Sequence, residues 1–140
     1  MDISEEDDFR KLNGIIEDAR KKVRVILKKH YQSTPHDRNR KKKELDFFYS
    51  LLQFATRKWV FDLLWEFEIN SKLGFNELSR NLGEISSRLL SDRLKELKKN
   101  KLINREVLET APPSVNYELT EKGKGFIELS MLIIWHLSGL

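Results

Sequence analysis

FNELSRNLGEISSRLLSDRLKELKKN, residues 75–100, has the pattern of a short helix, a tight turn and a second, longer helix. Gly83 supplies the positive φ that a sharp helix end needs. We expect Ile85 to fill the angle between the two helices, and Ser86 or Ser87 to cap the second one. The stretch therefore predicts a compact pair of helices.

The second helix of this pair is amphipathic. Leu90, Leu94 and Leu97 follow one another at steps of four and three, which places them on one buried stripe. The opposite face is short, polar and basic, and it consists of Ser87, Arg88, Ser91, Asp92, Lys95, Lys98 and Lys99. A helix-turn-helix needs such a face to enter a DNA major groove, but an ordinary corner of two helices also presents one to solvent. Both interpretations stay open on this stretch alone.

Composition limits the class of protein. A chain of 140 residues with 39% hydrophobic and 34% charged side chains fits one soluble, helix-rich domain with a real core. The net charge of +4 and pI near 9.3 favour polyanionic partners only mildly. The absence of cysteine excludes disulfides, thiolate metal sites and cysteine redox switches. Without a membrane-length apolar run or a signal-like start, the expected location is the cytoplasm.

We expect residues 1–44 to form a part of their own, ahead of a domain at 45–140. Its acidic tip, residues 1–8, is expected to be frayed. A helix is predicted from Phe9 to about Tyr31, because its apolar positions alternate steps of three and four. It is either a dimerisation arm or a helix packed on its own domain. A polar break at Gln32–Asn39 leads into a basic linker, which is a solvated helix start or a phosphate contact; its residues are Arg38, Arg40, Lys41, Lys42 and Lys43.

The segment from about Glu44 to Ile69 carries two apolar stripes that are expected to be core. The first stripe consists of Leu45, Phe48, Leu52 and Ala55, and the second of Trp59, Val60, Leu63, Leu64 and Phe67. We expect a break between two helices near Thr56 and Arg57, with Thr56 as a cap, and a turn at Ser71–Gly74.

After Lys101 the pattern changes to that of strands. Leu102–Leu108 and Val115–Leu119 are predicted as two short strands around the loop ETAPPS, whose two prolines interrupt pairing. A hairpin directly after the longer helix makes a wing. Thr120 begins a last, strongly apolar helix that must pack on the core, on a second subunit or on both. The predicted fold class is α+β, mainly α: a winged helix-turn-helix with additional N- and C-terminal dimerisation helices.

Several short motifs occur in a characteristic order. They are Lys58-Trp59, Phe75-x-Glu77-Leu78, Ile85-Ser86-x-Arg88-x-Leu90-Ser91, Arg93-Leu94-x-Glu96-Leu97 and Pro112-Pro113-x-Val115-x-Tyr117-x-Leu119-Thr120-x-x-Gly123. On these motifs, residues from about Arg57 to Leu119 resemble HxlR-type winged-helix transcriptional regulators, relatives of the MarR and PadR groups. The resemblance implies a homodimer joined by its N- and C-terminal helices, which binds an operator through two recognition helices.

The chain departs from that group in three ways. It lacks the cysteine that often precedes the Lys-Trp pair, so it cannot sense thiol redox state. Ser114 stands where the wing usually carries a basic residue, which puts the wing's usual DNA contact in doubt. The first 45 residues or so are longer than the group's usual lead-in, and the resemblance gives them no role.

Base and phosphate contacts are assigned to the exposed face of the second helix and to the wing. The expected DNA-binding residues are Ser86, Ser87, Arg88, Ser91, Asp92, Arg93, Lys95, Lys98, Lys99 and Ser114. Arg88 has the geometry to bind a guanine edge through two hydrogen bonds. Asp92 either pairs with Arg88 or accepts from a cytosine amino group. Arg93 and the lysines are phosphate contacts or plain solubilising charge.

The leading hypothesis is a sequence-specific dimeric regulator that reads a palindromic double-stranded DNA operator with a recognition helix at 86–100 and a wing at 102–119. The alternative is a winged-helix protein-interaction module of the transcription machinery, without DNA specificity of its own. An enzyme, a metal site or a cofactor is not expected, because His30, His36 and His136 fall in distant segments. Four aromatic residues either line a small-molecule effector cavity or belong to the core; they are Phe48, Phe61, Trp65 and Trp135.

Overall fold

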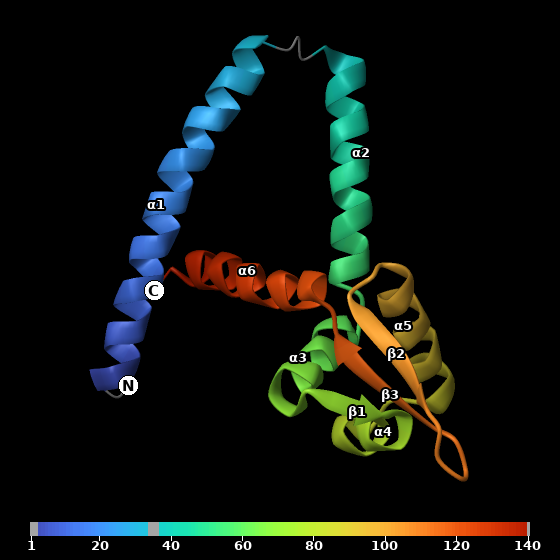
Figure 1. Cartoon of the computed structure of the whole chain (residues 1–140). Coiled ribbons are helices and arrows are strands. Elements are labelled where there is room, and N and C mark those ends of the chain that lie inside the picture. The colour runs from blue at the N-terminus through green and yellow to red at the C-terminus, as the bar shows by residue number, and fades with distance from the viewer. Residues whose placement is uncertain (1–2, 34–36, 140) are drawn as a thin grey trace. The chain divides into compact units, whose positions relative to one another are not determined.

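The computed structural model describes residues 3–33 and 37–139 (Figure 1). Its elements are α1 (Ile3–Ser33), α2 (Arg38–Ala55), α3 (Val60–Asn70), β1 (Lys72–Gly74), α4 (Phe75–Leu82), α5 (Ser87–Lys99), β2 (Ile103–Leu108), β3 (Ser114–Leu119) and α6 (Glu121–Ser138). Asp2 of the acidic tip, Thr34 and Pro35 of the polar break, and His36 lie outside the described residues. None of the helices within the described ranges has the length and apolar composition that crossing a membrane requires.

The chain divides into two compact units. Residues 50–129 form one, called here the winged unit, and residues 1–49 with 130–140 form the other, called the helical unit. The winged unit holds a hydrophobic core of side chains from each of its helices and from its sheet. The predicted leucine stripe is confirmed, because Leu90, Leu94 and Leu97 are all buried in this core. Val60, Leu63, Leu64 and Phe67 are buried with them, so the second apolar stripe is also core.

A three-stranded antiparallel sheet with the order β1-β3-β2 closes one side of the winged unit. The predicted wing is confirmed as β2 and β3, paired from Ile103 opposite Leu119 to Leu108 opposite Ser114. The prediction of a plain turn at Ser71–Gly74 is wrong, because Lys72–Gly74 pairs with β3 as a third strand. Leu73 is buried opposite Tyr117, and this one side chain is enough to fix so short a strand.

The break between α2 and α3 falls at the expected place, and Thr56 lies at it. The Thr56 hydroxyl donates to the Leu52 carbonyl at 2.7 Å, so Thr56 closes the end of α2. Trp59 precedes α3 with a φ of 78° and no side-chain cap. The predicted cap at Thr56 therefore belongs to the helix before the break.

The start of α6 is fixed against the end of α5. The Thr120 hydroxyl accepts from the Gly123 N–H at 3.0 Å and donates to the Lys101 carbonyl at 2.6 Å. Gly123 lies so close to β2 that a Cβ added there would stand 2.2 Å from the Leu102 carbonyl oxygen. Only a glycine fits at this approach, which gives a physical reason for the glycine of the Leu-Thr-x-x-Gly motif.

In the helical unit, α1 begins earlier than expected. The acidic residues predicted to be frayed are helical from Ile3 onward, because carboxylates such as Glu5 and Glu6 in the first turn interact favourably with the helix dipole. The end of α6 packs on α1 through stacked rings of Phe9 and Trp135, whose centroids are 4.0 Å apart. The Trp135 indole N–H also donates to the Asn13 side chain at 2.7 Å.

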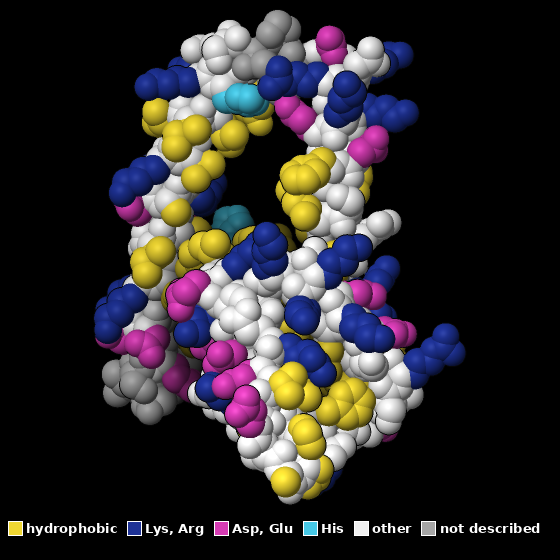
Figure 2. Space-filling model, turned by 45° about the vertical axis from the view of Figure 1, so that its right-hand side comes forward, with side chains coloured by type: hydrophobic (Ala, Val, Ile, Leu, Met, Phe, Trp, Pro, Cys, Tyr) yellow, Lys and Arg dark blue, Asp and Glu magenta, His cyan; other side chains and the backbone are white. Residues whose placement is uncertain are grey.

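Helix α2 has no buried residue, and exposed hydrophobic side chains are visible along both long helices (Figure 2). The prediction that Leu45, Phe48 and Leu52 are core is therefore wrong for this chain; Phe48, for example, is 57% exposed. Phe61 and Trp65 are exposed as well, and neither of the described pockets is lined by the four aromatic residues proposed for an effector cavity. Spacing places Leu45, Phe48 and Leu52 on one face of α2, but the described residues do not bury that face.

Candidate nucleic-acid interface

The pair α4–α5 has the caps and turn of a helix-turn-helix. The Gly74 N–H at the start of α4 donates to the Glu77 carboxylate at 3.4 Å. Gly83 ends α4 with a φ of 71°, and its N–H donates to the Ser79 carbonyl at 3.1 Å. Ser86 caps α5, because its hydroxyl accepts from the Leu89 N–H at 3.1 Å. The predicted positive φ at Gly83 and the cap at Ser86 are both confirmed.

Buried apolar residues hold α5 in place against the rest of the winged unit. Ile85 is buried between the two helices, as predicted, and the leucine stripe of α5 faces the same core. At about 100° per residue, the side chains opposite that stripe are those of Arg88, Asp92, Lys95 and Lys99. All four are exposed, so α5 presents a continuous polar face to solvent.

The remaining polar residues of α5 lie on one flank of this face. Ser87 and Lys98 are exposed there, and Ser91 is half-buried. The ion pairs that α5 forms within the described part of the chain come from Arg93 and Glu96, and neither Arg88 nor Asp92 takes part in one. The Arg88 guanidinium therefore lies at the surface on the second residue of the helix, where base contacts are usually made.

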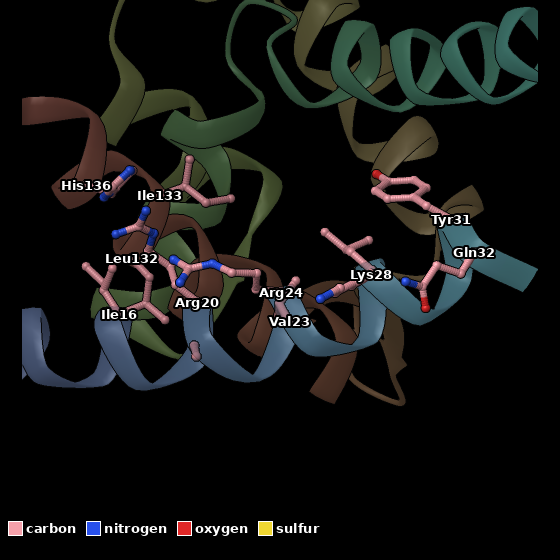
Figure 3. A pocket seen from close by; sticks show the side chains of 12 residues that line it. Ile16, Arg20, Val23, Arg24, Lys28, Tyr31, Gln32, Leu132, Ile133 and His136 are labelled. Carbon is pink, nitrogen blue, oxygen red and sulfur yellow. The ribbon is translucent and has the colours of Figure 1, made fainter. Parts of the chain in front are cut away.

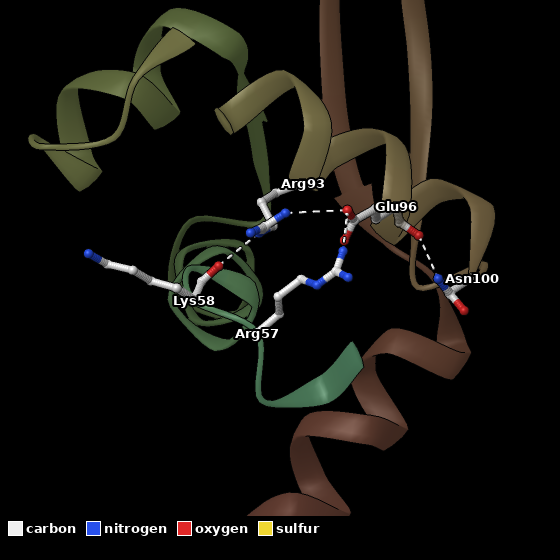
Figure 4. Close-up of polar contacts among 5 residues, drawn as sticks. All are labelled: Arg57, Lys58, Arg93, Glu96 and Asn100. Carbon is white, nitrogen blue, oxygen red and sulfur yellow. Dashed lines mark hydrogen bonds and ion pairs between the residues drawn. The ribbon is translucent and has the colours of Figure 1, made fainter. Parts of the chain in front are cut away.

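Arg93 lies on the other flank and turns away from this face (Figure 4). Its side chain is only 14% exposed, donates to the Lys58 carbonyl at 2.9 Å and pairs with Glu96 at 3.3 Å. Arg57 reaches the same Glu96 oxygen at 2.7 Å, and Asn100 donates to the Glu96 carbonyl at 2.8 Å. These contacts join α5 to the loop between α2 and α3. The structure thus separates Arg93 from the other predicted site residues.

The wing carries Ser114 at the base of its loop. The Ser114 hydroxyl lies 3.3 Å from that of Thr110, which also donates to the Pro112 carbonyl at 2.7 Å. These bonds stabilise the loop 109–113 from within. Arg105 is an exposed arginine on β2, opposite Tyr117. It is a cation of the wing that is not among the predicted DNA-binding residues. Its only signal in the sequence was a positive charge inside a strand pattern.

Pockets of the described residues lie elsewhere, and these residues contain no group of three potential metal ligands. The larger pocket is an apolar groove of about 840 Å³ beside α1 and the end of α6 (Figure 3). The smaller one, about 280 Å³, lies in the winged unit beside Glu68, Glu118, Lys124 and Glu128. Neither pocket includes a residue of α5.

Comparison with known proteins agrees with this geometry. Residues 54–137 match the family model described as HxlR-like helix-turn-helix. An uncharacterized HTH-type transcriptional regulator of Methanothermobacter thermautotrophicus is 47% identical over 60 residues, which cover 43% of this chain and 46% of that protein. YdzF of Bacillus subtilis, an uncharacterized HTH-type transcriptional regulator, is 31% identical over 87 residues, covering 62% of this chain and 79% of that protein.

A solved structure shows the same architecture. The reduced form of the transcriptional regulator YodB from Bacillus subtilis superposes with a TM-score of 0.53 at 30% identity. The superposition covers 62% of this chain and 85% of that one. The family match begins only at residue 54, so α1 and nearly all of α2 lie before it.

Proposed function

This chain belongs to the HxlR-like helix-turn-helix family, and we propose that it is a transcriptional regulator that binds a palindromic DNA operator as a homodimer. The observation that carries the proposal is the free polar face of α5. Its first turns present Ser87, Arg88 and Asp92 to solvent, while the opposite stripe is buried. A helix anchored in this way can enter a major groove without rearrangement of the core.

Each polar residue of α5 has a distinct role in this proposal. Arg88 binds a guanine edge, and Asp92 accepts from a cytosine amino group or orients Arg88. The lysines Lys95, Lys98 and Lys99 contact phosphates and add affinity without sequence preference. Arg93 is left out of the interface, because its bonds to Lys58 and Glu96 hold the helix in position.

In the wing, Arg105 replaces Ser114 as the proposed contact with DNA. The Ser114 hydroxyl is hydrogen-bonded to the Thr110 hydroxyl, so we propose that Ser114 stabilises the loop and does not contact DNA. An arginine on a wing strand can reach the phosphate backbone or the minor groove beside the recognition helix. The wing then contributes charge, although it lacks a basic residue after its two prolines.

Exposed apolar side chains on two helices support the homodimer. Among them are Phe48 and Leu51 of α2 and Leu129 and Ile133 of α6. Exposed large apolar side chains along a helix are typical of a subunit interface. A two-fold dimer presents two recognition helices, and its operator is then expected to be palindromic.

Replacement of Arg88 tests the assignment of base reading. We expect Arg88→Ala to cost about 1–3 kcal/mol of binding free energy on the selected operator and to flatten the preference at one base pair. The control, Lys95→Ala, should weaken all duplexes equally and lower the salt slope by about 1. Fluorescence anisotropy over a series of salt concentrations, with duplexes from a random-pool selection, measures both. Unchanged affinity and preference in Arg88→Ala would remove Arg88 from the interface.

The same salt titration distinguishes the proposed DNA-binding regulator from the alternative, a winged-helix module that binds only proteins. Contacts with phosphates make the affinity for DNA fall steeply as salt increases, because binding releases condensed counterions. A protein-interaction module need not bind DNA at all. Failure to bind any duplex at low salt would therefore favour the alternative over the proposed function.

A further inference from the structure

Helix α1 keeps an apolar stripe that the described residues of the helical unit leave exposed. Ile15, Val23 and Ile26 are 53%, 50% and 66% exposed. Together with Leu12 and Ala19 they share one side of the helix, since they follow at steps of three and four. The end of α6 covers only the neighbouring side, and the groove there stays open along the second half of α1 (Figure 3). The stripe therefore lacks a partner among the described residues.

The charges of α1 are divided between its two halves. Residues 3–18 carry six acidic and two basic side chains, whereas residues 19–33 carry six lysines and arginines and no carboxylate. The ion pairs of α1 that the structure shows join residues three or four apart, such as Lys11 with Asp7 and Lys22 with Asp18. These exposed local pairs do not change the polarity of the helix as a whole.

This polarity distinguishes the two ways in which a second copy can pack on the stripe. A parallel pair of α1 helices places acidic end beside acidic end and basic end beside basic end, which is unfavourable. An antiparallel pair places each acidic end beside the basic end of the other copy. A crossing centred on Ala19 puts Ile15 of one copy beside Val23 of the other, and Asp8 beside His30. The small side chain of Ala19 permits a close approach at the centre.

We propose that α1 pairs antiparallel with α1 of a second copy of this chain, through the stripe Leu12, Ile15, Ala19, Val23 and Ile26. The proposal rests on the proposed homodimer and adds an interface that lies outside the matched residues 54–137. The charge pattern sets the direction of the pair, and the apolar stripe supplies its affinity. α1 thereby becomes a self-association element of the full chain.

Because the chain has no cysteine, single introduced cysteines can map this interface by mild oxidation. In an antiparallel pair, two copies of Ala19→Cys cross-link with each other at the centre. Asp8→Cys and His30→Cys each form few cross-links alone, but a mixture of the two variants cross-links efficiently, because position 8 of one copy lies beside position 30 of the other. Glu17→Cys is the matched control, since it lies near the centre in sequence but on the opposite side of the helix. Efficient self-cross-linking at both ends would instead show a parallel pair and overturn the proposal.

Reversal of charge gives an independent test. Glu5→Lys with Asp8→Lys brings the net charge of residues 3–18 from −4 to zero, and Lys28→Glu with Lys29→Glu lowers that of residues 19–33 from +6 to +2. We expect either double variant alone to weaken self-association about tenfold, and an equimolar mixture to restore part of it, as measured by sedimentation. A mixture no stronger than either variant alone would contradict the antiparallel arrangement.

The outcomes separate this inference from the proposed function. If no cross-link forms at Ala19 while the chain remains a dimer that binds DNA, the α1 pair is wrong and the homodimer stands. If the chain sediments as a monomer and still binds DNA, both the homodimer and the α1 pair are wrong. Cross-linking at Ala19 in a chain that binds no DNA would support the α1 pair and contradict the proposed DNA-binding function.

Discussion

The winged unit and the helical unit use apolar side chains in opposite ways. In the winged unit, one face of α3 and the leucine stripe of α5 lie in one core, and Phe67 is only 2% exposed. In the described part of the helical unit, Ile16 is the one buried hydrophobic residue, and Phe47 is 68% exposed. The first unit builds a hydrophobic core of its own, and the second leaves most of its large apolar side chains exposed, as the proposed homodimer requires. The family match covers the first and nearly excludes the second.

The largest expected effect comes from equal truncations in the two units. Phe67→Ala should lower the free energy of unfolding by about 3–5 kcal/mol, because it leaves a cavity in a closed core. Phe48→Ala should lower it by less than about 0.5 kcal/mol in dilute protein, but it should weaken self-association. Denaturant unfolding and light scattering measure the two quantities. Equal loss of unfolding free energy in both variants would show that α2 is packed within the single chain.

A smaller effect is expected at two glycines of α6. Gly123→Ala should destabilise the winged unit by about 2–3 kcal/mol, because its Cβ would overlap the Leu102 carbonyl. Gly125→Ala meets nothing within 4 Å and should stabilise the helix by about 0.5–1 kcal/mol. Thermal unfolding followed by circular dichroism compares them. A tolerated alanine at position 123 would mean that α6 can move away from β2.

The smallest effect is expected at the surface of the winged unit. Arg57→Ala removes the 2.7 Å ion pair with Glu96 and should cost less than about 1 kcal/mol of unfolding free energy, because the Arg57 side chain is half exposed. Its effect on DNA affinity should be larger than that of Arg80→Ala, an exposed arginine on α4 used as the control. If both variants bind the operator alike, the loop at 56–59 has no part in positioning α5.

The elements with strong periodicity were predictable from the sequence. Leu90, Leu94 and Leu97 identified α5, and the two prolines at 112 and 113 identified the loop of the wing. The strand β1 was missed, because a single buried Leu73 between turn-forming residues carries no period. The early start of α1 is not predicted, because the acidic residues 1–8 are expected to be frayed although carboxylates suit a helix N-terminus.

Side-chain partners were harder to predict than elements. Spacing shows which residues share a face, but it does not show whether another segment covers that face. Leu45, Phe48 and Leu52 were therefore assigned to a core that the single chain does not build. Arg93 was assigned to DNA because it lies on a basic helix, yet its partner Lys58 is 35 residues away in sequence. The predicted contacts of Arg88 and the lysines with DNA stay predictions.

The bonds around Glu96 have a consequence for signalling through the molecule. One carboxylate oxygen of Glu96 serves both Arg57 and Arg93, and Arg93 in turn binds the Lys58 carbonyl, so the loop after α2 and the flank of α5 share their polar contacts. If this loop is displaced, either these bonds break or α5 moves with the loop. In the proposed dimer, a change of subunit packing at α2 would therefore be transmitted through these bonds and would change the orientation of α5.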